Sequence, residues 1–191
     1  MAQPSHFLKL PRELRDKIHE FTVLAHPSTI KQSVPPQRSG FFASKAPLLL
    51  ASKQMHNEYT TIVHEVVTSA SFPEAIIEAS ITDVDFASFI AYTEALTPAE
   101  CEVVTAKLHI RLNFSTQKTV MDLCQNLSVW AQNCESTGMT AEYEVGSRIQ
   151  KEDWLSMRSA TFIAVEHMGL PGGEIGKIHR ALLAWRGVDA M

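Results

Sequence analysis

The stretch AKLHIRLNF, residues 106–114, alternates apolar and polar side chains along its whole length. The apolar positions are Leu108, Ile110, Leu112 and Phe114. The polar positions between them are Lys107, His109, Arg111 and Asn113. Because side chains in an extended chain point alternately to opposite sides, this period of two predicts a β-strand with one buried face. The strand places a strip of basic side chains on its other face, either a solvated surface or a recognition surface for an acidic peptide.

Helical signals lie on both sides of this strand. Upstream, Thr97 and Glu100 have the spacing of a capping box, which predicts a helix start there. Downstream, residues 117–136 have apolar side chains at helical spacing, and Gly138 stands where a left-handed residue would end the helix.

The remaining sequence after Pro73 extends the same pattern. We expect strands within 74–85 and 139–146, helices over 86–96 and 151–168, and a short final helix from Ile175. The order is that of a small mixed α/β body with a short sheet, covering residues 69–191.

The N-terminal part has a different character. FLKLPRELRDKIHEF, residues 7–21, predicts an amphipathic helix with Pro11 at its first position. Its apolar side chains recur at i, i+4 and i+7, namely Leu14, Ile18 and Phe21. These residues must be buried against the rest of the chain or against another molecule.

A connection of unusual length follows, at residues 26–45. Its prolines and glycine predict that it contains no regular element; they are Pro27, Pro35, Pro36 and Gly40. A second helix then begins near Pro47 and carries Met55 on its apolar stripe.

The two N-terminal helices together resemble the F-box-like motif of fungal proteins, which pairs a Leu-Pro-x-Glu-Leu-Arg-x-x-Ile segment with a Leu-Leu-x-x-x-Arg-Gln-Ile-x-x-Glu segment. The first segment is matched by Leu10, Pro11, Glu13, Leu14, Arg15 and Ile18. The second is matched by Leu48, Leu49, Gln54, Met55 and Glu58. The chain departs from the motif at His19, where the family has Tyr or Trp, and at Lys53, where it has Arg.

The resemblance implies an α+β protein in which an F-box-like helical motif, residues 1–68, packs on the α/β body. It also implies a function: an interaction adaptor or scaffold that recruits an unknown substrate protein to a ubiquitin ligase through the Skp-type linker subunit of a cullin complex. The residues expected to bind the partner are Leu10, Pro11, Leu14, Ile18 and Met55 as apolar anchors, with Arg15 at the rim. The alternative is that this helical pair packs on the body and binds nothing.

Composition limits the classes of binding partner and the cellular compartment that we expect for this chain. The net charge of −4 provides no basic field for nucleic acid or an anionic membrane. No apolar run approaches the roughly 20 residues that span a bilayer, and the first residues lack a signal-peptide pattern. The three cysteines have no CxxC spacing, which favours buried thiols in a reducing compartment, the cytoplasm or nucleus.

The sequence contains no pattern typical of a catalytic or cofactor site. His56 and His64 lie eight positions apart, without the i,i+4 spacing of a helical zinc site. We therefore expect no enzyme activity, cofactor or metal. Two alternatives stay open: a ligand-binding or enzymatic domain in the C-terminal part, and a fungal host-targeting protein.

Overall fold

The chain folds as an α+β protein, as the sequence predicts. The computed structural model of the chain describes residues 6–30, 42–43, 53–115, 118–146, 149–166 and 173–185. Its helices are the 3-10 helix η1 (His6–Lys9), α1 (Arg12–Ala25), α2 (Lys53–Thr68), α3 (Ala87–Thr93), α4 (Pro98–Lys107), α5 (Val120–Thr137), α6 (Lys151–Glu166) and α7 (Gly173–Ala184). Its strands are β1 (Ser28–Ile30), β2 (Phe42–Ala43), β3 (Ile77–Thr82), β4 (Leu108–Asn113) and β5 (Glu142–Val145).

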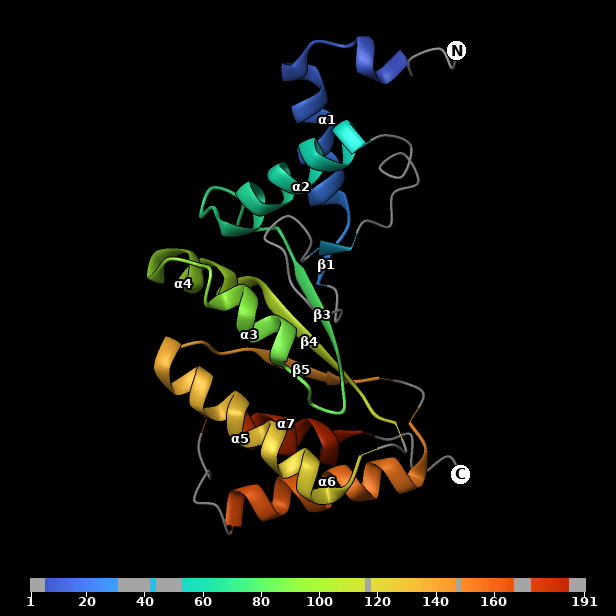
Figure 1. Cartoon of the computed structure of the whole chain (residues 1–191), viewed down its shortest axis with the longest axis vertical. Coiled ribbons are helices and arrows are strands. Elements are labelled where there is room, and N and C mark those ends of the chain that lie inside the picture. The colour runs from blue at the N-terminus through green and yellow to red at the C-terminus, as the bar shows by residue number, and fades with distance from the viewer. Residues whose placement is uncertain are drawn as a thin grey trace.

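The described strands form one sheet in the order β2-β1-β3-β4-β5. β1, β3, β4 and β5 run parallel, and β2 pairs antiparallel with β1 at the edge. In Figure 1, α3 and α4 lie to the left of the sheet and α5 lies below and to its left, and buried side chains of these helices and of β3 and β4 belong to one hydrophobic core. The opposite face of the sheet carries exposed polar side chains, as the alternation in β4 predicts.

The core lies between the sheet and these helices. Trp130 of α5 is fully buried and stacks on Phe86 with ring centroids 4.2 Å apart. Its indole Nε1 donates a hydrogen bond to the Tyr143 hydroxyl of β5, at 2.8 Å. The three cysteines are buried free thiols, as expected: Cys101, Cys124 and Cys134.

Local signals place the helix ends correctly. Thr97 accepts a hydrogen bond from the backbone of Glu100, and the Glu100 carboxylate accepts one from Thr97, so the capping box is complete. Thr119 and Asp122 form a second capping box at the start of α5. Gly138 ends α5 with φ +68°, in the left-handed region that favours glycine.

The connection 26–45 differs from its prediction, because it contributes two short strands. Ser28 N donates to Ile76 O at 2.8 Å, and β1 then pairs with β3. Pro27 immediately precedes the strand, where a missing N–H is tolerated. Three-residue strands lack the length for a periodic signal, and for this reason the pattern missed β1. Several residues of the sequence predictions lie outside the described ones: Pro35, Pro36, Gly40, Pro47, Leu48 and Leu49.

Lys107 also departs from its predicted place. It is the last residue of α4 rather than part of the strand, and it is 5 % exposed. Its Nζ donates hydrogen bonds to the carbonyl oxygens of Val66, Val67 and Ser69, at 3.0, 3.1 and 2.7 Å. These carbonyls lie at the C-terminal end of α2, so a cation here satisfies acceptors that the helix leaves open. Burial lowers the pKa of the Lys107 ammonium.

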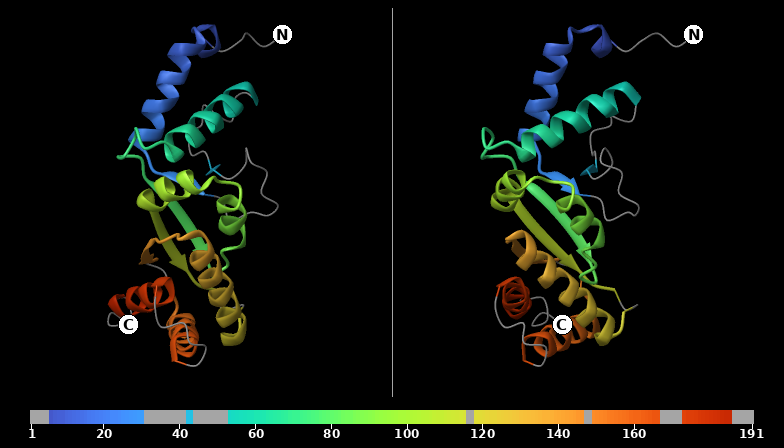
Figure 2. Two further views of the ribbon diagram at one scale, coloured as in Figure 1. Left: turned by 90° about the vertical axis from the view of Figure 1, so that its left-hand side faces the viewer. Right: turned by 60° about the vertical axis from the view of Figure 1, so that its left-hand side comes forward.

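The helices at the two ends of the chain lie at opposite ends of the molecule. α1 lies at the top of Figure 1 and α6 at the bottom, with the sheet between them. The same separation is visible in both views of Figure 2. α1 and α2 pack against each other, and α6 packs against α5 and α7.

Candidate functional site

Helix α1 turns its apolar row outward. Leu14, Ile18 and Phe21 are 52 %, 42 % and 67 % exposed. The opposite side of the helix is buried and contains two polar side chains; its buried residues are Arg15, His19 and Val23. Amphipathic helices in globular proteins normally bury the apolar row and expose the charges. α1 departs from this pattern, because it buries Arg15 and His19 and leaves three large apolar side chains largely exposed.

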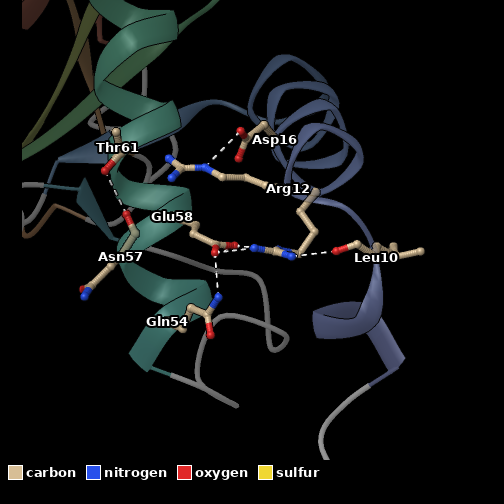
Figure 3. A network of polar contacts seen from close by, with 8 residues as sticks. Leu10, Arg12, Asp16, Gln54, Asn57, Glu58 and Thr61 are labelled. Atoms are coloured by element: carbon tan, nitrogen blue, oxygen red, sulfur yellow. Dashed lines mark hydrogen bonds and ion pairs between the residues drawn. The ribbon is translucent and has the colours of Figure 1, made fainter.

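An ion pair between the helices holds α1 in this orientation. The Arg15 guanidinium donates from Nε to Glu58 Oε2 at 2.9 Å and from Nη2 to Glu58 Oε1 at 2.7 Å. Its Nη1 donates to the Leu10 carbonyl at 2.6 Å, and Gln54 Nε2 donates to Glu58 Oε1 at 2.9 Å. In Figure 3 the carboxylate of Glu58 points from α2 toward the side where Leu10 lies, and Gln54 lies next to Glu58. A two-pronged guanidinium–carboxylate pair fixes geometry as well as charge.

The chemistry of this pair favours the ionised carboxylate. The side chains of Arg15 and Glu58 are 9 % and 12 % exposed. Hydrogen bonding from Arg15 lowers the pKa of Glu58 to about 2. The pair therefore remains charged through the physiological range, and the contact between α1 and α2 is maintained there.

His19 fills the space beside the ion pair. Its ring lies between Phe7 and Tyr59, with centroid distances of 5.4 and 5.6 Å. It stands where the F-box-like pattern has Tyr or Trp, and it packs as an aromatic residue would. Burial lowers the pKa of the His19 imidazole, so the neutral ring is favoured.

The residues predicted to bind a partner divide into two groups. Leu14 and Ile18 are exposed, Pro11 is exposed at the start of α1, and Leu10 is partly buried. Met55 is 1 % exposed, so it packs inside the protein and presents no docking surface. Arg15 lies in the interior ion pair rather than at a rim. Phe21, on the same row as Leu14, belongs to the exposed surface; its i+7 spacing was the signal for it.

The polar face of the sheet does not form the basic strip that the sequence predicts. Lys107 is buried elsewhere, and the other two basic residues face carboxylates: His109 Nδ1 lies 3.8 Å from Glu142 Oε2, and Arg111 Nη2 lies 3.6 Å from Glu144 Oε2. Together with Glu78 they line a hollow of about 170 Å³. Among its described lining residues the acidic groups outnumber the basic ones, so this face does not suit an acidic peptide.

The turn after β3 is strained but internally satisfied. Asp83 and Val84 have φ values of +54° and +50°, unusual for residues with a β-carbon. The Asp83 carboxylate accepts hydrogen bonds from the backbone N and the hydroxyl of Ser115, at 2.7 and 2.6 Å, and Asn126 donates to its carbonyl. These contacts account for the strained conformation as part of the fold.

Two kinds of feature are absent from the part of the chain that the structure describes. It contains no group of three or more His, Cys, Asp or Glu side chains that could hold a metal ion. No helix within it is both long and apolar enough to cross a membrane.

The chain was compared with protein-family models, curated proteins and solved structures, and none of them matches it. The F-box-like resemblance therefore stays a prediction from the two helical segments. The exposed row of α1 is the candidate functional surface, and we call the residues Leu14, Ile18 and Phe21 the α1 surface.

Proposed function

We propose that the chain is an interaction adaptor of the cytoplasm or nucleus, which binds a partner protein through the α1 surface. The single observation that supports this function is the exposure of Leu14, Ile18 and Phe21 on one row of α1. A row of large apolar side chains in water is unfavourable by about 25 cal/mol per Å² relative to its burial. Docking of another protein removes that area from water.

The α1 surface has the form of a helix-in-groove ligand. Anchors at i, i+4 and i+7 are the spacing with which an amphipathic helix enters an apolar groove. The Arg15–Glu58 pair lies on the buried side of α1 and fixes which side of the helix points outward. Leu10 and Pro11 lie just before the helix, where Pro11 is exposed and Leu10 is partly buried.

The candidate partner is the Skp-type linker subunit of a cullin ubiquitin ligase, which the F-box-like segments suggest. In that case the chain recruits a substrate protein to the ligase. The inward position of Met55 leaves docking to the outer row of α1 and to the residues before it.

Binding to the purified linker subunit tests the proposal directly. Leu14→Ala and Phe21→Ala each remove an anchor and should weaken binding by about tenfold or more, as loss of a central interface residue does. Met121→Ala is the matched control, because Met121 is 75 % exposed and its helix, α5, lies far from α1 in Figure 1. Its affinity should equal that of the wild type.

Two results contradict the proposal. One is a chain that does not bind the linker subunit at all. The other is binding that Leu14→Ala and Phe21→Ala leave unchanged while both variants stay folded. Thermal unfolding of each variant separates lost binding from lost structure.

A further inference from the structure

Helices α6 and α7 form the two sides of an open groove, at the end of the molecule opposite α1. Its volume is about 620 Å³, which is within the range of ligand sites. Its lining residues are Leu155, Arg158, Ser159, Phe162, Ile163, His179 and Leu183. Three of them are large apolar side chains that are about half exposed: Leu155 at 45 %, Phe162 at 53 % and Leu183 at 52 %.

The walls of the groove are fixed to each other. Trp154 Nε1 of α6 donates to the Leu182 carbonyl of α7 at 3.1 Å, and Thr161 Oγ1 lies 2.9 Å from His179 Nδ1. α7 is also tied to the start of β5, because the buried Glu174 carboxylate accepts a hydrogen bond from Ala141 N at 2.9 Å. The groove is thus formed before any partner arrives, which lowers the entropic cost of binding.

The shape of the groove suits a helix. Leu155, Ser159 and Phe162 follow one another at i, i+4 and i+7 on α6, and His179 and Leu183 at i and i+4 on α7. Two such ridges, side by side, leave a channel into which the side chains of a third helix can interdigitate.

The charge of the groove indicates that its partner carries a negative charge at the contact. Among the described residues that line it, Arg158 is the one permanently charged side chain and none is a carboxylate. The Arg158 guanidinium lies 5.2 Å from the centroid of the Trp154 ring, a cation–π contact that orients it. A carboxylate on the partner would complement this exposed, oriented cation.

From these four features we infer that the α6–α7 groove binds an amphipathic helix of another protein, with its apolar side chains against Phe162 and Leu183 and an Asp or Glu beside Arg158. This site is separate from the α1 surface and does not depend on the proposed function. Because α1 and α6 lie at opposite ends of the molecule, both surfaces remain accessible at the same time.

Selection from a displayed library of helical 20-residue peptides, with the whole chain as bait, tests the inference. The selected peptides should carry apolar residues at i, i+3 or i+4 and i+7, together with Asp or Glu. Phe162→Ser should weaken their binding by about tenfold or more. Arg158→Glu should weaken it too, and a Glu→Lys change in the peptide should restore the affinity for that variant.

Controls separate this groove from other surfaces and from lost folding. Phe21→Ser on α1 should leave peptide affinity unchanged, whatever it does to the linker subunit. Arg158→Glu alters an exposed side chain, so it decides the question even where Phe162→Ser fails to fold. Three results overturn the inference: no selected peptide depends on Phe162 or Arg158, the peptides show no acidic preference, or the chain is a dimer in sedimentation that Phe162→Ser dissociates.

Discussion

Leu14 and Arg15 are neighbours in the chain, yet α1 directs the leucine into water and the arginine into the protein. Leu14 is 52 % exposed and Arg15 is 8 % exposed. The reason is the carboxylate of Glu58, 43 residues further along, which binds the guanidinium through two hydrogen bonds. The orientation of the candidate docking surface is therefore set by a polar contact on its reverse side.

Loss of that carboxylate should destabilise the protein. Glu58→Gln keeps the shape but removes the charge, and we expect unfolding to become easier by about 2 kcal/mol at pH 7. The folded pKa of Glu58, about 2, lies below its ordinary value of 4.5, so its stabilising effect is complete above pH 4.5 and declines as pH falls toward 2. Denaturant unfolding at several pH values should thus show the two proteins converge in acid.

Glu65→Gln is the control for this change, because Glu65 is exposed on the same helix. It should alter the unfolding free energy by less than about 0.5 kcal/mol. A Glu58→Gln penalty that persists undiminished at pH 2 would contradict the assignment.

His19→Phe should change the response to mild acid. The folded pKa of His19 lies below its ordinary value of 6.5 because the ring is buried, so protonation favours the unfolded chain. The contribution of the neutral ring is complete above pH 6.5 and is lost as pH falls below it. As pH falls from 6.5 to 5, the stability of the phenylalanine variant relative to the wild type should therefore increase, as measured by thermal unfolding. Parallel profiles of the two proteins across this window would refute the prediction.

Lys107→Met should break the link between α4 and the end of α2. The substitution leaves three carbonyl acceptors without their donor, and we expect a loss of about 2 to 3 kcal/mol in unfolding free energy. Lys151→Met changes an exposed lysine at the start of α6 and should have almost no effect. Equal effects of the two variants would show that the Lys107 contacts do not stabilise the fold.

The two sides of α1 should respond differently to truncation. Val23 is 2 % exposed, and Val23→Ala should cost about 2 kcal/mol of stability. Leu14→Ala removes a larger side chain from the same helix but should cost no more than about 0.5 kcal/mol, because the leucine is already in water. Urea unfolding of both variants measures the difference. A larger penalty at Leu14 than at Val23 would mean that the outer row is covered in solution.

The α/β body was predictable because its signals are local. The alternation in β4 gave its buried face, and Thr97 and Gly138 marked helix ends through contacts within a few residues of themselves. Lys107 was misplaced because α4 runs directly into β4 with no loop, so the alternating pattern began one residue before the strand.

The candidate site was harder to predict, because helical periodicity identifies two faces but not which one points inward. A charged residue can be buried when a partner distant in sequence neutralises it, as Glu58 does for Arg15. Met55 shows the same limit for an apolar residue. Its place on an apolar stripe was recognised, and its burial depended on which elements pack over that stripe.

The pairing of β1 with β3 also determines where the chain can be truncated. A shortened chain that starts after α2 would lose β1 and leave the backbone N–H and C=O groups along that side of β3 without their neighbour. An unprotected strand edge readily recruits strands from other molecules. The N-terminal helices and the body are thus joined by a shared sheet, and separating them would convert an interior strand into a site of self-association.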